Sequence, residues 1–240
     1  LHDALPILIV GCLGGFFALN SCTAPTNEKD YSVFVNPFIG TGGHGHTFPG
    51  AVVPHGMIQP SPDTRIDGWD ACSGYYYEDS TINGFSHTHV SGTGCCDYGD
   101  VLLMPTVGEQ RYQTTDPQSQ QLAYSSAFSH ENETAEPGYY SVFLDTYQVK
   151  AEISATKRGA IHRYTFPESS EAGFILDLDY SLQRQTNSDM GIEVISDTEI
   201  CGHKKTTYWA FDQYINFYAK FSKPFSYTLV TDSITMDNGK

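Results

Sequence analysis

The sequence predicts an all-β domain, and specifically a β-sandwich. Past residue 105 the chain divides into short runs rich in β-branched and aromatic residues, with turn signals between them. Apolar and polar residues alternate with a period of two over residues 207–221, as in a half-buried strand. Helical spacing of apolar residues is scarce. At 240 residues and 40% hydrophobic content, the chain is large enough for one large β domain or two small ones.

The charge of the chain argues against a nucleic-acid partner. The formal net charge is −15, and no basic patch of the kind that binds phosphates is visible. Aromatic residues make up 13% of the chain. For most of them we favour a place in strands and core, because Tyr and Phe suit half-buried pleated surfaces; the alternative is a platform that stacks on sugars.

The N-terminus is expected to be a targeting segment rather than part of the fold. Residues 5–19 form an almost unbroken apolar run, which is too short to span a bilayer but typical of a signal peptide. The Leu19-Asn20-Ser21-Cys22 sequence that follows resembles a bacterial lipobox. We therefore predict a signal peptide at residues 1–22 with lipidation at Cys22, a polar linker at 23–30, and export to the periplasm or cell surface on an outer-membrane or cell-surface lipid anchor.

Five runs downstream are the predicted strands. Each is rich in β-branched or aromatic residues, and Pro and Gly mark the ends of several. They are residues 139–144, 148–154, 160–166, 173–179 and 207–221. In the last run Trp209 and Phe211 are expected on the buried face with the other odd-numbered apolar residues. The chain stops at residue 240 with no closing element, so the domain at 31–240 is expected to be incomplete at its C-terminus.

Three loops upstream are expected to carry the function. They lie within residues 36–50, 61–75 and 84–100, and they combine Gly and Pro with His, Asp and aromatic residues. Gly lets a ligand approach the backbone closely, and binding groups concentrate on loops held by a rigid scaffold. A polar ligand site rimmed by aromatic side chains is the interpretation that these residues favour.

Paired histidines in these loops raise a metal hypothesis. His44 with His46, and His87 with His89, stand two residues apart, and Asp97, Asp100, Cys72 or Cys95 could complete a ligand set. Histidines beside Gly in loops more often bond the backbone or ligand hydroxyls, so we assign no metal ligand. The cysteines outside the leader, namely Cys72, Cys95, Cys96 and Cys201, are expected to be free or singly paired thiols.

The carboxylates of these loops could also supply an acid and a base. Glycoside hydrolysis needs such a pair, but Asp beside Gly or Pro most often forms turns. Neither a serine-hydrolase elbow nor a P-loop is present. The candidates are Asp63, Asp67, Asp70, Glu78, Asp79, Asp97 and Asp100.

Several segments, in the right order, resemble glycoside hydrolase family 92. The matching segments are residues 35–51, 61–64, 68–75, 84–95, 137–142 and 161–166. The likeness covers essentially residues 31–240. Two positions depart from the family pattern: His55 stands where Phe is expected, and Cys96 makes an unusual pair with Cys95.

The resemblance implies an exported, calcium-dependent, inverting exo-α-mannosidase that acts on N-glycans or mannan. Members have an N-terminal β-sandwich and a C-terminal (α/α)6 barrel, with the sugar bound at the junction. The general acid, the general base and most calcium ligands belong to the barrel, so no catalytic residue and no metal ligand is assigned here, and the chain alone is expected to be inactive. The substrate-binding residues that the resemblance assigns to this chain are Gly42, Gly43, His44, Trp69, Asp70 and Cys72.

Two alternatives remain open beside an α-mannosidase domain. A stand-alone carbohydrate-binding domain would bind α-mannoside glycans without hydrolysing them. A metal-dependent enzyme built on the paired histidines would contain stoichiometric zinc.

Overall fold

The computed structural model describes residues 29–112, 120–231 and 235–237. The chain divides into two compact units, Leu1–Tyr31 and Ser32–Lys240, and the fold described below is that of the second. The expected signal peptide at residues 1–22, with Cys22, lies outside the described residues, as does most of the linker at 23–30. The described residues include no helix whose length and apolar character would let it cross a membrane.

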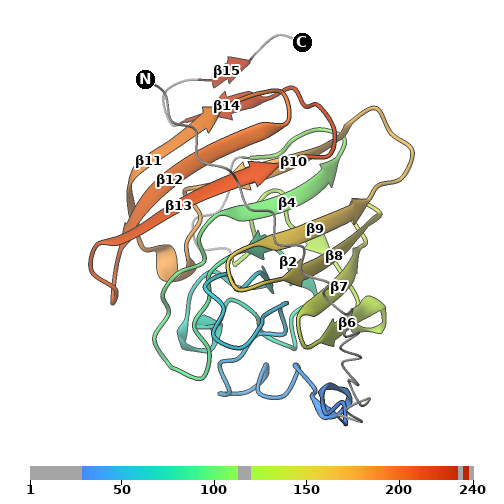
Figure 1. The fold of residues 1–240 in the computed structure, drawn as a ribbon, viewed down its shortest axis with the longest axis vertical. Coiled ribbons are helices and arrows are strands. Elements are labelled where there is room, and N and C mark those ends of the chain that lie inside the picture. Colours follow the sequence, from blue (N-terminus) through green and yellow to red (C-terminus); the bar gives the residue numbers. More distant parts are fainter. Residues whose placement is uncertain (1–28, 113–119, 232–234, 238–240) are drawn as a thin grey trace, which may run out of the picture. The chain divides into compact units, whose positions relative to one another are not determined.

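The predicted all-β class is confirmed, because the regular elements of the described residues are β-strands and short 3₁₀ helices. A first four-stranded antiparallel sheet has the order β1-β3-β4-β10 (Figure 1). Its strands are β1 (Ser61–Asp63), β3 (Gly84–Ser86), β4 (Leu102–Val107) and β10 (Ala172–Asp177).

A second four-stranded sheet is an antiparallel meander in chain order. Its strands are β6 (Glu133–Glu136), β7 (Tyr139–Leu144), β8 (Val149–Ala155) and β9 (Ala160–Thr165). The buried apolar residues of β7 and β8 stand at alternate positions, which is the pattern of a strand with one face in the core.

The hydrophobic core joins the two four-stranded sheets. Phe85 of β3 lies 6.4 Å from the Tyr140 ring of β7 and 6.3 Å from the Tyr164 ring of β9. Met104 of β4 and Ile153 of β8 belong to the same buried cluster. These contacts pack one face of each sheet against the other, as the predicted sandwich requires.

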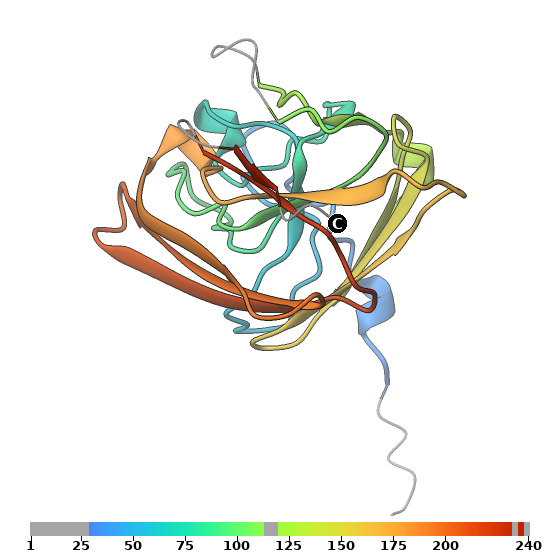
Figure 2. The same cartoon turned by 90° about the horizontal axis from the view of Figure 1, so that it is seen from above.

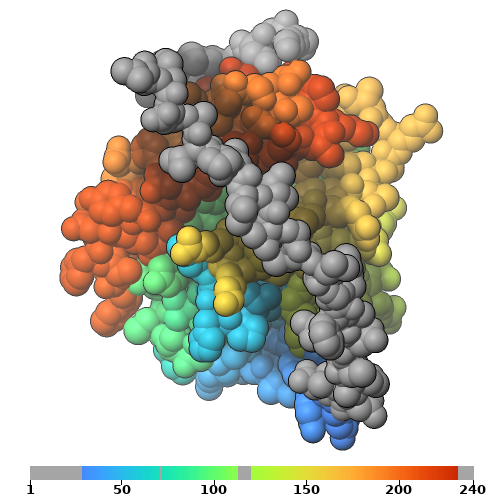
Figure 3. Space-filling view, viewed as in Figure 1, coloured from blue at the N-terminus to red at the C-terminus, as the bar shows by residue number. Residues whose placement is uncertain are grey.

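A third sheet carries the order β11-β12-β13. Figure 1 shows its strands as long neighbours, and the second view shows their common curvature (Figure 2). In the space-filling view they form one orange-to-red region of the visible face (Figure 3). They are β11 (Thr186–Val194), β12 (Glu199–Thr207) and β13 (Gln213–Lys220).

The strand predicted over residues 207–221 is wrong at its start. Residues 208–212 form the turn between β12 and β13, where Trp209 and Phe211 are exposed rather than buried. The backbone N–H of Ala210 donates to Asp97 at 2.7 Å, which holds this segment as a turn. From residue 213 on, the predicted alternation of half-buried and exposed residues is observed. The other four predicted strands agree with β7, β8, β9 and β10 to within two residues.

The remaining elements are short strands and 3₁₀ helices that lie outside the three larger sheets. Two small sheets pair β2 with β5 and β14 with β15. They are β2 (Thr81–Ile82), β5 (Ser126–Ala127), β14 (Thr228–Val230) and β15 (Thr235–Asp237). The 3₁₀ helices are η1 (Ser32–Phe34), η2 (Trp69–Ala71), η3 (His130–Asn132) and η4 (Leu182–Arg184).

Candidate functional site

The first functional loop is folded back on itself by its glycines. Gly40 and Gly43 have φ values of 85° and 56°, in the left-handed region that favours glycine. A Cβ on Gly45 would collide with the Gly40 backbone, so only glycine fits there. His46 has a φ of 53°, which is uncommon for a residue with a side chain. This local geometry fixes the directions of His44 and His46.

The second loop presents Trp69 on the short helix η2. Two thiols lie beneath this turn: Cys72 Sγ donates to the Trp69 carbonyl at 2.6 Å, and Cys96 Sγ donates to the Gly68 carbonyl at 3.5 Å. Both thiols are buried, and Trp69 is 56% exposed. Burial raises the pKa of both thiols, so they support the turn as neutral donors.

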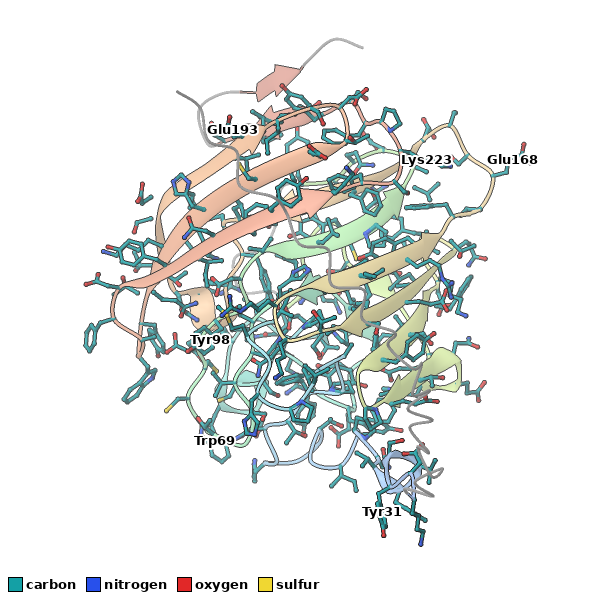
Figure 4. All side chains as sticks on the ribbon, viewed as in Figure 1. Tyr31, Trp69, Tyr98, Glu168, Glu193 and Lys223 are labelled. Atoms are coloured by element: carbon teal, nitrogen blue, oxygen red, sulfur yellow. The ribbon has the colours of Figure 1, made fainter. Side chains whose placement is uncertain are left out.

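The two loops meet at Asp70. His44 Nδ1–H donates to Asp70 Oδ1 at 2.7 Å, and His46 Nε2 lies 3.7 Å from the same oxygen. The Trp69 ring packs on both imidazoles, at 4.8 Å from His44 and 4.4 Å from His46. The hydrogen bond from His44 lowers the pKa of the Asp70 carboxyl, which keeps it ionised. Figure 4 shows Trp69 among the loops, far from Glu193 of β11.

The structure thus brings together three of the six predicted substrate-binding residues, namely His44, Trp69 and Asp70. Gly43 is exposed and adjoins His44, whereas Gly42 lies against Tyr77 and Glu78. Cys72 is 1% exposed, beneath the Trp69 turn rather than on its open side.

Two further residues of this cluster are absent from the predicted site. His46 is buried beside Asp70 and Trp69. The His-x-His spacing with His44 is the sequence feature that could have identified it as a site residue. Gly94 lies so close to the Trp69 indole Nε1 that a Cβ would collide with it. The sequence places Gly94 in the third predicted loop, but it does not show what the backbone there approaches.

The second histidine pair does not join this cluster, and among the described residues it forms no metal-binding group with Asp97, Asp100, Cys72 or Cys95. His89 Nε2 lies 2.7 Å from Asp63 Oδ1, and both side chains are fully buried. His87 instead contacts His162, with 3.1 Å between their Nε2 atoms. These are contacts within the scaffold.

Most of the candidate carboxylates are also engaged by the scaffold. Asp97 accepts the Ala210 N–H, and Asp100 lies 3.0 Å from the buried Lys204 ammonium. Asp79 accepts two guanidinium nitrogens of Arg65, and Asp67 accepts from Gln120 and Arg184. Of the loop carboxylates, Asp70 is the one whose partners are the two histidines that pack against the exposed Trp69 indole.

A separate polar cavity of ≈ 350 Å³ is lined in part by residues of the 64–67 segment of the second loop. The Arg65–Asp79 ion pair contributes to its wall, with Glu78 and Gln120 beside it. Trp69 is not part of its lining. Because small-ligand sites are mostly apolar with a few convergent polar groups, the aromatic cluster at Trp69 is the better candidate site.

Comparison with known families places the chain among glycosidases. The family described as Glycosyl hydrolase family 92 N-terminal domain matches residues 34–240. A protein of Arthroderma benhamiae named an uncharacterized secreted glycosidase is 31% identical over 156 residues, which is 63% of this chain and 19% of that protein.

Solved structures give the same result. A family GH92 α-mannosidase from Bacteroides thetaiotaomicron, in complex with mannoimidazole, is 41% identical with a TM-score of 0.74. The match covers 80% of this chain and 25% of that one. The family GH92 inverting mannosidase of the same organism is 28% identical with a TM-score of 0.67, covering 87% and 28%. The chain therefore spans about a quarter of the length of these structures.

Proposed function

This chain belongs to glycoside hydrolase family 92, as its N-terminal domain, and we propose that it forms one wall of the mannoside pocket of an exported α-mannosidase. The proposal extends to residues 31–240 as a β-sandwich domain that meets a C-terminal catalytic barrel. It rests on the family match and on the two related mannosidase structures.

The observation that carries the proposal is the cluster of Trp69, His44 and Asp70. An exposed indole can pack on the apolar C–H face of a sugar, while a carboxylate and an imidazole bond its hydroxyls. Exposed backbone at Gly43 adds donors and acceptors that no side chain shields. Gly42 and Cys72 take part by shaping the loop and holding the Trp69 turn. One related structure contains mannoimidazole, which supports a mannoside as the ligand.

In this proposal the general acid and the general base lie in the longer protein, outside this chain. Inverting hydrolysis needs two carboxyl groups roughly 6.5–9.5 Å apart with a water between them. The scaffold contacts of Asp67, Asp79, Asp97 and Asp100 leave them poorly placed for such a pair. A related structure is named an inverting mannosidase, and this supports inversion as the proposed outcome.

The described residues do not fit the calcium ion that the family implies. Ca²⁺ takes roughly six to eight oxygen ligands. A metal could be shared by three or more His, Cys, Asp or Glu side chains that lie close together. Among the described residues one such group is present: His44, His46 and Asp70. Two nitrogens and one carboxylate are a poor set for calcium, so we assign calcium to the C-terminal domain.

We propose that the protein is exported to the periplasm or cell surface. The apolar run at residues 5–19 is typical of a signal peptide, and one relative is named secreted. We propose cleavage before Cys22, lipidation of that residue, and residues 23–30 as the tether between anchor and domain.

The experiment compares two exposed tryptophans. We expect Trp69→Ala to weaken binding of methyl α-mannoside at least about tenfold, since aromatic packing contributes roughly 0.5–1.5 kcal/mol beyond area burial. Trp209→Ala is the matched control, because Trp209 is 65% exposed on the β12–β13 turn. Saturation-transfer NMR and calorimetry on the 240-residue chain measure both. The same chain should release no aryl group from an aryl α-mannoside with calcium present.

Equal binding by the two variants, or no binding by the unmodified chain, would contradict the proposed pocket. Turnover that disappears in Asp70→Ala would instead contradict the placement of the acid and base. The gene sequence distinguishes the two functions. A reading frame that continues into a catalytic barrel would support the mannosidase over the stand-alone carbohydrate-binding domain.

A further inference from the structure

We propose that His44, His46 and Asp70 bind a divalent d-block cation, for which Zn²⁺ is the natural probe. Each residue offers one ligand atom, and these atoms all lie within 4.8 Å of one another. The inference goes beyond the mannoside pocket and does not depend on it. A hydrogen-bonded sugar site needs Asp70 and His44 only, whereas a metal site needs all three groups.

One of the three separations between ligand atoms is already close to that of a tetrahedral site, and all three lie within 4.8 Å. Zinc–nitrogen and zinc–oxygen bonds of about 2.0–2.2 Å place neighbouring ligand atoms about 3.3 Å apart. The separation of 3.7 Å between His46 Nε2 and Asp70 Oδ1 is near this value. The 2.7 Å contact between His44 and Asp70 must lengthen slightly. The His44 side chain is 71% exposed and free to make that adjustment.

A second observation supports the site: the buried His46 side chain has a ring nitrogen without a hydrogen-bond partner. Its side chain is 5% exposed, and its Nε2 is buried with no hydrogen-bond partner. A buried polar atom without a partner costs about 1–3 kcal/mol. Nε2 is aimed toward Asp70 but too far away for a hydrogen bond. A cation between the two would satisfy both groups.

The loop holds His46 in this position at a conformational cost. Its φ of 53° lies in the left-handed region, and strained backbone of this kind clusters at functional sites. The backbone carbonyl of His46 accepts the N–H of Gly92 from the third loop, and the Trp69 ring packs edge-on against the imidazole. The surrounding structure therefore fixes the buried ligand, while the exposed His44 leaves a path for the ion.

The donor set selects the class of cation. Imidazole nitrogens suit zinc, copper, nickel and cobalt, whereas calcium and magnesium prefer oxygen ligands alone. Binding at His44 Nδ1 displaces the proton that now bridges to Asp70, and in the neutral ring that proton moves to Nε2, the other tautomer. Three protein ligands leave at least one coordination position open, as in catalytic rather than structural zinc sites.

The test uses the 240-residue chain without a polyhistidine tag, and without any sugar. We expect one equivalent of Zn²⁺ to bind by calorimetry, and Co²⁺ to give visible absorption bands of a low-coordinate site. His44→Ala and Asp70→Ala should each weaken Zn²⁺ binding at least about tenfold, because each removes one of three ligands. Both residues are partly or largely exposed, so these variants should still fold.

The matched control is His203→Ala. His203 Nε2 lies 3.7 Å from Asp189, the same separation as between His46 and Asp70, but that pair is exposed and no third ligand joins it in the part of the chain that the structure describes. Unchanged Zn²⁺ affinity in this control, with losses in the two site variants, supports the proposal. Absence of Zn²⁺ binding up to millimolar concentration, or equal losses in all three variants, overturns it. Because no mannoside is present, failure of the mannoside pocket would leave this result unaffected.

Discussion

At the scale of single residues, the position of Trp69 depends on a glycine in another loop. Gly94 lies against the edge of the indole, and a Cβ there would overlap Nε1. The obstructing atom belongs to a side chain that is 56% exposed and can move outward. A larger residue at position 94 should therefore displace Trp69 rather than unfold the domain.

We predict that Gly94→Ala shifts the Trp69 indole and weakens methyl α-mannoside binding several-fold. The free energy of unfolding should change by less than about 1 kcal/mol, because the clash is relieved at the surface. Intrinsic fluorescence and calorimetric binding are the measurements. The control is Gly159→Ala, where a Cβ would meet only Thr156 Oγ1, at 3.7 Å. Identical fluorescence spectra of Gly94→Ala and the unmodified chain would contradict the prediction.

At the scale of elements, a chain of neutral hydrogen bonds joins the two four-stranded sheets. His87, directly after β3, donates from Nδ1 to the Val101 carbonyl at 2.6 Å, so its Nε2 is an acceptor. His162 of β9 donates to it from Nε2 and accepts the Tyr164 hydroxyl at Nδ1, at 2.8 Å. Burial lowers the pKa of His87 and lowers that of His162 well below its usual value. A proton added to either ring would break this chain.

We therefore predict that the domain loses stability as the pH falls below about 6.5. In the unfolded chain both imidazoles bind protons below that pH, whereas in the folded domain they resist protonation. Each imidazole contributes a slope of about 1.4 kcal/mol per pH unit while it is protonated only in the unfolded state. Urea unfolding between pH 5 and 7.5 measures the slope, and His162→Phe should reduce it.

The control for the pH effect is His55→Asn, which removes an exposed imidazole and keeps a residue type that tolerates the φ of 59° at this position. Its slope should match that of the unmodified chain. A slope unaffected by His162→Phe would show that other groups cause the acid sensitivity.

At the scale of the domain, a buried ion pair fixes the three-stranded sheet to the functional loops. Lys204 of β12 lies 3.0 Å from Asp100 Oδ1, with both side chains fully buried, and its ammonium donates to the Tyr180 carbonyl at 2.7 Å. The other oxygen of Asp100 accepts from Thr88 and from Gln213 of β13. Asp100 therefore links the third loop, which supplies Gly94, to two strands of that sheet.

We predict that Lys204→Met lowers the free energy of unfolding by about 3–5 kcal/mol, because it leaves the Asp100 carboxylate buried without its counter-ion. The matched control is Lys220→Met on the neighbouring strand β13. Lys220 lies 2.8 Å from Glu199, but its side chain is 67% exposed, so the loss should be about 0–1 kcal/mol. Urea unfolding at neutral pH measures both. A loss below about 1 kcal/mol in Lys204→Met would show that the pair does not stabilise the sheet.

The sequence by itself determined the all-β class, the family and four strands of the downstream region. These depend on local pattern: alternation, turn residues and motif order are all readable along the chain. The same local pattern failed at residues 208–212, where a bond from Ala210 to Asp97, 113 residues away, imposes a turn on a strand-like sequence.

Only the tertiary structure decided which residues form the candidate site. Both His-x-His pairs looked equivalent in sequence, yet one meets Asp70, 26 residues away, and the other is divided between Asp63 and His162. Seven loop carboxylates were candidates, and scaffold partners from distant segments engage most of them. The physical reason is that the role of a side chain depends on its neighbours in space. Those neighbours are brought together by contacts between residues that are far apart in the sequence.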